Sequence, residues 1–512
     1  MGIFDLRGES ITFVSESYPV YFPHLGFAEQ DPKDWWEALK KAVRRALKRS
    51  KINPSEIGAI GIDATSCTVL FTDKQGNPLR RAIIWMDVRA FKEAKFIAST
   101  NHPALKYNGW SNVSAEWMPC KALWVKRNEP QIYHKAYRVC EYIDWLTYRL
   151  TGRWTASENN TTIRWYYDEP GGGWPQEFYK EIGLEDILEK FPPEVVKLGE
   201  KVGNIRPEVA KEIGLNPKTP VAQGGADGYV AMLGLTVTKP GRMAFITGSS
   251  HAHLGLTEKE LHHKGIFGSF PNAVIPGLNI VEGGQISTGS VIKWFKENFC
   301  HRELQKAAKR GSDIYEILNH QARKIKPGSE GLIVLEHWQG NRTPYADPLS
   351  RGMIWGLSLK HETPHLFRAI MEGVAYGTEL ILRTFRESGF MPEKIFACGG
   401  ATKSKLWMQI HSDVSNIPIY IPKEPEATCL GSAILASVGS SYYDSLQEAS
   451  EKMVKIADVV EPNSENHEIY KFYLDKYIRS YKKMQELVHE LVEHEQTDSG
   501  EELAEGLEPP TC

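Results

Sequence analysis

The sequence lacks the common signatures of nucleotide-binding and metal-binding loops. It contains neither Gly-x-x-x-x-Gly-Lys-Ser/Thr nor Gly-x-Gly-x-x-Gly. Its seven cysteines are scattered without a Cys-x-x-Cys pair, so we expect neither a disulfide framework nor a structural zinc site. No run of about 18 apolar residues occurs, and the first eight residues hold no signal-peptide core. These absences predict a soluble, cytoplasmic protein with no membrane partner.

An excess of charge of one sign is also missing. The 61 basic and 64 acidic residues leave a net charge of −3, with no long one-sign block outside the acidic tail. This balance argues against nucleic acid as a partner. The 512 residues suffice for two large cores. We expect one domain over 1–238, a second over 239–440, a helical extension over 441–496 and a disordered tail over 497–512.

Periodicity predicts alternating helices and strands. Asp31 and Pro32 have the order of a helix cap and first turn, and 363–388 reads as one long helix. The run 57–62 reads as a buried strand, and 139–151 as a helix closed by Gly152. We expect a helix over 464–495 and an α/β fold.

A single carboxylate, Asp227, stands in the run Val221–Met232 behind a pair of glycines. Glycines allow a tight turn or a close approach by a ligand. The residues alone leave two readings of Asp227 equally open: a helix N-cap or a catalytic carboxylate.

Three turns of glycine and hydroxyl residues follow Asp227 along the chain: Gly248-Ser249-Ser250, Gly289-Ser290 and Gly399-Gly400-Ala401. Each could be an ordinary loop. Backbone N–H groups at such turns can also receive phosphate. In the first half, small polar residues end two predicted strands, at 63–67 and 86–89, where α/β sheets place ligands. We therefore expect a nucleotide held by the second half and a small molecule held by the first.

Longer motifs make the chain resemble the FGGY family of carbohydrate kinases over residues 2–440. Gly352–Leu357, seven further residues and His365–Glu372 fit that family's C-terminal signature. Asp63–Thr68, Trp85–Arg89 and Gly340–Pro344 resemble the ribulokinase-like members. The resemblance implies two actin-like (ribonuclease H-like) ATPase domains with a cleft between them.

The resemblance also implies roles for single residues. Asp227 would be the catalytic base, ATP and Mg²⁺ the cofactors, and the metal ligands stay unassigned. The implied sugar-binding residues are Thr65, Ser66, Cys67, Trp85, Asp87 and Arg89. The implied nucleotide-binding residues are Thr247, Gly248, Ser249, Gly289, Gly400, Ala401 and Ser404.

The implied activity is ATP-dependent phosphorylation of the terminal hydroxyl of a ketopentose, with ribulose favoured. Two alternatives stay open: a kinase for another ketose or polyol such as xylulose or erythritol, and a non-catalytic sugar- or nucleotide-binding relative. A homodimer is one option for assembly. Family members carry an Asp-x-Gly-Thr-like turn just upstream of a segment resembling Gly2–Gly8. That turn is not in this sequence, so we expect the present form to be weakly active or inactive.

Overall fold

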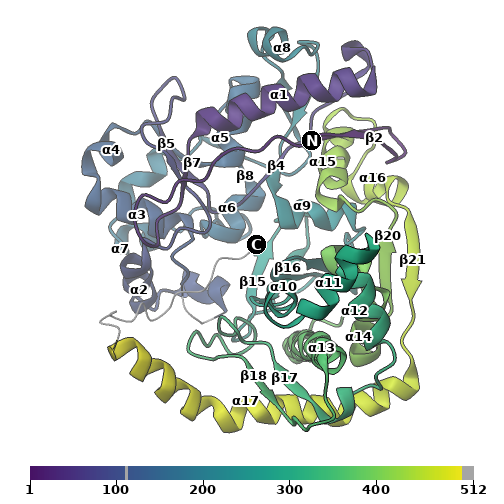
Figure 1. Ribbon diagram of the computed structural model, residues 1–512. Helices are drawn as coiled ribbons and strands as arrows, with labels where there is room; N and C mark the ends of the chain where they lie inside the picture. The colour runs from purple at the N-terminus through teal and green to yellow at the C-terminus, as the bar shows by residue number, and fades with distance from the viewer. Residues whose placement is uncertain (110–112, 499–512) are drawn as a thin grey trace.

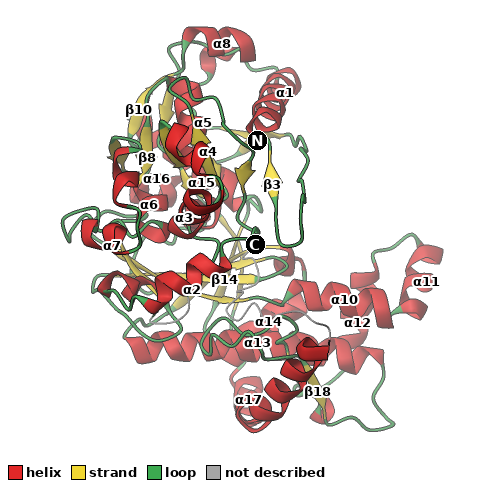
Figure 2. Cartoon of the chain, turned by 90° about the vertical axis from the view of Figure 1, so that its left-hand side faces the viewer, coloured by secondary structure: helices red, strands yellow, loops and turns green. Residues whose placement is uncertain are grey.

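The computed structural model describes residues 1–109 and 113–498, with side chains described up to Glu495. Most of the predicted disordered tail, 499–512, lies outside the described residues. None of the helices in the described ranges is both long and apolar enough to cross a membrane. Figures 1 and 2 show most N-terminal elements toward one end of the molecule and most C-terminal elements toward the other, while α15 (Ala427–Gly439) and α16 (Leu446–Met453) lie beside N-terminal elements.

The N-terminal part of the chain is built from small sheets. A four-stranded antiparallel sheet has the order β3 (Glu29–Gln30), β6 (Ala82–Ile83), β5 (Val69–Thr72) and β7 (Arg138–Glu141). Two short strands, β4 (Asp63–Ala64) and β12 (Gly225–Ala226), pair in parallel and form a separate two-stranded sheet. The remaining strands are β1 (Gly2–Phe4) with β2 (Ser10–Phe13), β8 (Thr155–Ser157) with β9 (Glu194–Val196), and β10 (Lys201–Asn204) with β11 (Pro220–Ala222).

Helices cover these sheets, and the first of them follows the predicted pattern. In α1 (Pro32–Ser50) the Asp31 side chain accepts a hydrogen bond from Lys33 N, and proline occupies the first turn. Trp35 and Ala46 on its apolar face are 1% exposed. The other helices of this part are α2 (Phe91–Ser99), α3 (Met118–Asn128), α4 (Pro130–Lys135), α5 (Tyr142–Thr151), α6 (Glu158–Arg164), α7 (Gln176–Glu181), α8 (Pro207–Ile213) and α9 (Asp227–Gly234).

Two sequence predictions in this part are wrong. The run 57–62 forms no continuous strand: only Ile60 makes a bridge, to Val221, while Gly61 lies against the Ser432 carbonyl of another helix. Residues 139–141 belong to β7 rather than to a helix, because pairing with β5 outweighs their helical spacing. The predicted helix end is confirmed, since Gly152 caps α5 in the left-handed conformation at φ 78°.

The C-terminal part is organised by one seven-stranded sheet. Its order is β15 (Phe267–Pro271), β16 (Asn279–Gln285), β14 (His251–Thr257), β13 (Arg242–Thr247), β19 (Lys394–Gly399), β20 (Ile419–Pro422) and β21 (Ile456–Val460). The predicted long helix is confirmed as α13 (Thr363–Ser388), buried along most of its length. The other elements are α10 (Gly289–Phe299), α11 (His301–Arg310), α12 (Ile314–Ala322), β17 (Ile333–Leu335), β18 (Met353–Trp355), α14 (Lys405–Ser415), α15 (Ala427–Gly439) and α16 (Leu446–Met453).

Helices α9 and α15 cross in close contact where the two parts of the chain meet. A Cβ added to Gly431 would lie 2.1 Å from the Val230 carbonyl oxygen, and one added to Gly234 would lie 2.0 Å from the Ala427 carbonyl oxygen. Such distances leave room only for glycine. The crossing therefore fixes the helix that begins at Asp227 against the C-terminal part.

The extension ends in α17 (Ser464–Asp498), which confirms the predicted charged helix. Figure 1 shows α17 along the outer edge of the molecule, opposite α1. Tyr477 and Tyr470 of α17 are buried, and the Tyr477 hydroxyl donates to Glu336 Oε2 at 2.8 Å. The extension is therefore part of the C-terminal core, and its strand β21 forms one edge of the large sheet.

Candidate functional site

Asp227 stands at the carboxyl end of a strand, where ligands of α/β proteins bind. It follows β12 directly and is the first residue of α9, so the helix N-cap is Ala226 and not Asp227. The register pairs Gly225 with Asp63 and Ala226 with Ala64, so Thr65 and Asp227 each directly follow one of the two paired strands, at the same end of the pair. We call Asp63, Thr65 and Asp227 the strand-end site.

Both carboxylates at the strand-end site have raised pKa values. Burial raises the pKa of Asp227 above its usual range, although Gly228 N donates to its Oδ1 at 2.8 Å. Burial raises the pKa of Asp63 to about 6; the Ser432 hydroxyl, at 2.6 Å from Oδ2, opposes the rise, and the charge of Asp227 adds to it. A carboxylate with a raised pKa is a better proton acceptor, which suits a general base.

The polar run behind β4 divides into exposed and buried groups. Thr65 and Ser66 are partly exposed, and the Thr65 and Thr68 hydroxyls are 3.0 Å apart. Cys67 is 1% exposed, and burial raises the pKa of its thiol to about 12. Its backbone N donates to Glu141 Oε2 at 2.9 Å. Thr65 and Ser66 can therefore offer their hydroxyl groups to a ligand. The buried Cys67 instead holds the backbone of residues 63–67 in place through its hydrogen bond to Glu141.

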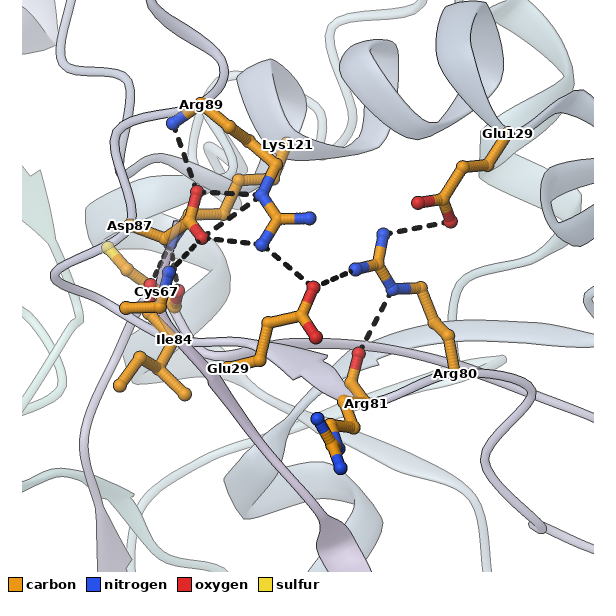
Figure 3. Close-up of polar contacts among 10 residues, drawn as sticks. Glu29, Cys67, Arg80, Arg81, Ile84, Asp87, Arg89, Lys121 and Glu129 are labelled. Carbon is orange, nitrogen blue, oxygen red and sulfur yellow. Dashed lines mark hydrogen bonds and ion pairs between the residues drawn. The ribbon is translucent and has the colours of Figure 1, made fainter. Parts of the chain in front are cut away.

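Asp87 and Arg89 form the centre of a buried ion network (Figure 3). The Asp87 carboxylate, fully buried, accepts from Ala28 N at 2.6 Å, from Arg89 N at 3.0 Å and from the Arg89 guanidinium at 2.7 Å. Arg89 reaches on to Glu29 at 2.8 Å, and Arg80 also pairs with Glu29. Since protein donors surround Asp87, the network holds the segment that displays the partly exposed Trp85.

Lys121 joins this network to the run behind β4. Its Nζ, fully buried, donates to the Cys67 carbonyl oxygen at 2.6 Å and to the Ile84 carbonyl oxygen at 2.8 Å (Figure 3). Burial lowers the pKa of Lys121, and the surrounding acidic groups oppose that change. One ammonium group thus ties the ends of two predicted sugar-binding segments together.

The three predicted glycine turns come together in the C-terminal part. The Ser249 carbonyl oxygen accepts from Thr288 N at 3.0 Å and from Ser290 N at 3.1 Å, and a Cβ on Gly289 would lie 2.2 Å from the Gly248 carbonyl oxygen. Thr247 Oγ1 donates to the Cys398 carbonyl oxygen at 2.7 Å and accepts from Ala401 N at 3.1 Å. We call the hairpin 247–250 with Gly289 and Gly400 the glycine-turn site.

The glycine-turn site offers exposed backbone. Gly248, Ser249 and Gly400 are exposed, and nothing lies within 4 Å of a Cβ built on Gly400. Ser404 has a structural contact instead: its hydroxyl accepts from Trp407 N at 3.2 Å as the N-cap of α14 and donates to Asn319. The nucleotide role predicted for Ser404 stays a prediction.

The two sites are neighbours. Gly228 follows Asp227, and Ile246 precedes Thr247. A Cβ added to Gly228 would lie 3.9 Å from Ile246 Cδ1. Parallel pairing of β13 with β19 brings Gly399 level with Thr247 at the same sheet edge. The Asp227 carboxylate of the strand-end site and the turns of the glycine-turn site therefore lie close enough for one ligand to contact both.

A buried ion cluster joins the two parts of the chain beside these sites. Glu282 on β16 accepts from Arg164 at 3.1 Å and from Arg342 at 2.9 Å, and the Tyr229 hydroxyl of α9 also donates to it. All four side chains are buried. Burial alone would raise the pKa of Glu282, but the two guanidinium groups outweigh it and hold the pKa at about 2.

Family comparison identifies the chain. The model of the FGGY family of carbohydrate kinases, N-terminal domain, matches residues 1–234, and the model of the C-terminal domain matches residues 243–440. The chain belongs to the FGGY family of carbohydrate kinases. It is accordingly a sugar kinase, a phosphotransferase with an alcohol group as acceptor.

Relatives of this FGGY kinase cover nearly its whole length. It is 34% identical over 516 residues to an FGGY carbohydrate kinase domain-containing protein of Xenopus laevis, covering 93% of this chain and 92% of the relative. It is 33% identical over 485 residues to a ribulokinase of Bacillus licheniformis, covering 90% and 87%. The structure of a xylulose kinase from Rhodospirillum rubrum matches with TM-score 0.84 at 23% identity, covering 95% and 96%. The last match confirms the two-domain actin-like fold.

The FGGY kinase contains important residues that sequence reasoning missed. The sequence predicts Asp63 only as part of the polar run 63–67, and Glu282 is not among the predicted site residues. Asp63 lies on the strand paired with the one that precedes Asp227, and Glu282 contacts the helix that begins at Asp227. One signal was available for Glu282. It interrupts an apolar strand, and a charge in such a place is retained only when it is paired.

The residues present fit a magnesium nucleotide. Among the described residues, no group of three or more His, Cys, Asp or Glu side chains is arranged to hold a metal ion. Magnesium sites of kinases commonly use only one or two carboxylates and complete the shell with phosphate oxygens and water. Asp227 and Asp63 could supply these carboxylates, and the glycine-turn site leaves the backbone open to phosphate.

Proposed function

We propose that this FGGY kinase transfers the γ-phosphoryl group of ATP to the terminal hydroxyl of a ketopentose, with ribulose as the favoured substrate and Asp227 as the base. The observation that carries the proposal is the position of Asp227, a carboxylate of raised pKa that follows a strand end and neighbours the glycine-turn site. The 33% identical ribulokinase supports the choice of ribulose.

Each site has a part in the proposed reaction. Asp227 accepts the proton of the sugar hydroxyl as its oxygen attacks phosphorus. Thr65 and Ser66 bind sugar hydroxyls, and Trp85 covers the sugar. Asp227 and Asp63 would hold Mg²⁺ together with the phosphate oxygens, and the metal would neutralise phosphate charge when bound. Asp87 and Arg89 orient the segment of Trp85, because their charged groups already bind each other.

The nucleotide is assigned to the glycine-turn site. The hairpin at Thr247, Gly248 and Ser249 would receive one phosphate, with the Gly248 N–H held within the hairpin by the Ser250 carbonyl oxygen at 2.9 Å, and the helix start at Gly289 would receive another. Gly400 and Ala401 would line the adenosine pocket, where the open space over Gly400 leaves room for a flat base. Closure of the two parts over the sugar would exclude water, which competes as a nucleophile.

A coupled ADP-release assay tests the proposal on ribulose, xylulose, erythritol and glycerol. We expect kcat/KM for a ribulose enantiomer to exceed the others by at least ~10-fold, since a site that hydrogen-bonds each hydroxyl rejects analogues that lack or misplace one. Asp227→Asn should lower kcat by roughly 10² to 10⁴-fold, and the exposed Asp458→Asn should have no effect. Higher kcat/KM on glycerol would reject the substrate, and near-full activity of Asp227→Asn would reject the base.

A further inference from the structure

A polar cavity lies outside the two sites, where the C-terminal extension packs on the C-terminal core. Its volume is about 280 Å³. Helix α13 contributes Glu379, Arg383 and Arg386, and the end of α14 contributes Val414, Ser415 and Asn416. The first turns of α17 contribute His467, Lys471 and Leu474. The cavity is thus lined by three helices, and α17 forms one of its walls.

Positive charge predominates in this cavity. Glu379 is its single lining carboxylate, against the two guanidinium groups and the ammonium group of Lys471. Glu379 is already balanced, because Arg386 contacts both its oxygens at 2.9 and 3.1 Å and Arg383 Nε contacts Oε1 at 3.1 Å. The cavity therefore keeps an excess of positive charge after its internal ion pairs are formed.

Several donors remain for a ligand. Arg383 binds Glu379 through its Nε, and Arg383 and Asn416, which both line the cavity, are exposed. Lys471 Nζ contacts Glu468 at 2.6 Å, but the two side chains are 52% and 68% exposed, so solvent screens that pair. A guanidinium, an amide and an ammonium, one from each of the three helices, match the oxygens of a phosphate group.

We propose that this cavity is a second ligand site, distinct from the sugar and nucleotide sites, that binds a small phosphomonoester. Its volume is near the lower end of the ~300 to 1,000 Å³ of small-molecule sites, which suits a sugar phosphate better than a nucleotide. Arg383 and Lys471 contact the phosphate, and Arg386 holds Glu379 away from it. The site uses α17, so it gives the C-terminal extension a binding role that does not depend on the sugar specificity of the kinase.

Binding of inorganic phosphate and of ribose 5-phosphate, each measured by calorimetry on the full chain with saturating ADP, tests this proposal. Ribose is the uncharged control. We expect ribose 5-phosphate to bind and ribose not to bind. Arg383→Ala and Lys471→Ala should each weaken binding by ~10-fold or more, the loss of one charge-assisted hydrogen bond. If inorganic phosphate binds as tightly as ribose 5-phosphate, the site recognises the phosphate group alone, and free phosphate is its ligand.

The matched control is Arg310→Ala, which removes an exposed arginine from the end of α11. Its phosphate binding should equal that of the wild type. If the cations only stabilise α13 and the start of α17, Arg383→Ala and Lys471→Ala will lower the unfolding temperature without changing phosphate binding, and the proposal is overturned. Absence of phosphomonoester binding to the wild type overturns it as well. Should Arg383→Ala not fold, Lys471→Ala decides alone, because that side chain is half exposed.

Discussion

The Tyr229 hydroxyl donates a hydrogen bond to Glu282 Oε2, and so ties the helix that begins at Asp227 to a strand of the seven-stranded sheet. Arg164 and Arg342 complete the contact from the two parts of the chain. The position of Asp227 relative to the glycine-turn site therefore depends on a buried charge cluster as well as on the crossing of α9 and α15.

Glu282→Gln should destabilise the protein strongly. The change leaves two buried guanidinium groups beside a neutral amide, and breaking a buried ion pair costs about 3 to 5 kcal/mol. Tyr229→Phe should cost less, about 1.5 to 3 kcal/mol, since it removes one hydrogen bond to a charged group. Urea unfolding measures both. Glu194→Gln is the control, because the Glu194 and Arg153 side chains are each 52% exposed. Equal stability of Glu282→Gln and Glu194→Gln would contradict the prediction.

Asp63→Asn should move the acid limb of the activity profile. If Asp227 must be ionised to act as a base, kcat/KM falls as the pH drops through its raised pKa. The charge of Asp227 raises the pKa of Asp63, and the same repulsion acts on Asp227 and opposes its ionisation whenever Asp63 is itself ionised. Its removal should lower the pKa of Asp227 and shift the limb to lower pH. The profile of kcat/KM between pH 5 and 9 is the measurement.

Ser432→Ala tests the same influence without changing Asp63 itself. The substitution removes the hydroxyl that donates to the Asp63 carboxylate and lowers its pKa. Asp63 should then take up its proton at higher pH. Asp63 would then be uncharged over more of the pH range in which activity falls. The acid limb of Ser432→Ala should therefore shift to lower pH, as in Asp63→Asn. A limb that stays in place in both variants would show that Asp63 does not influence the base.

Gly289→Ala should impair nucleotide binding more than sugar binding. The new Cβ would lie 2.2 Å from the Gly248 carbonyl oxygen, so the hairpin 247–250 must move away from α10. We expect KM for ATP to rise ~10-fold or more, with a smaller change in KM for the sugar. Gly58→Ala is the control, since nothing lies within 4 Å of its added Cβ. An unchanged KM for ATP would remove Gly289 from the nucleotide site.

The sequence allowed prediction of features that depend on local pattern. Asp227 behind paired glycines and the turns at Gly248, Gly289 and Gly400 are short motifs, and their positions along the chain follow the family order. The structure shows that these turns converge, as at Thr247, whose hydroxyl contacts Cys398 and Ala401.

Features that depend on distant partners could not be predicted. Asp63 is notable because pairing of β4 with β12 places it beside Asp227, and its Ser432 contact spans 369 residues. Residues 139–141 have helical spacing, but the pairing partner β5 makes them a strand. Gly61 is close to the Ser432 carbonyl, and nothing in its local sequence indicates that contact.

Acid should destabilise the C-terminal part through three histidines behind the glycine-turn site. His251, His253 and His411 are buried around Phe245, with ring centroids 4.8, 5.1 and 4.9 Å from it. Burial lowers the pKa of His251 well below its usual value and that of His253 and His411 to about 3. The folded state thus binds fewer protons than the unfolded state. The stabilisation is complete above pH ~6.5 and is lost as the pH falls toward 3.

Each such histidine should contribute about 1.4 kcal/mol per pH unit to the slope of unfolding free energy below pH ~6.5. Buried carboxyls of raised pKa, such as Glu336 at about 7, stabilise the folded state as the pH falls and so oppose the effect of the histidines. The slopes of a variant and the wild type are therefore compared, because the slope of one protein sums both effects. His411→Phe keeps an aromatic ring among its aromatic neighbours and should flatten the slope between pH 7.5 and 5 by the contribution of one histidine. The exposed His301→Phe should not change it. Urea unfolding at several pH values is the measurement, and an equal slope in wild type and His411→Phe would show that His411 is not responsible.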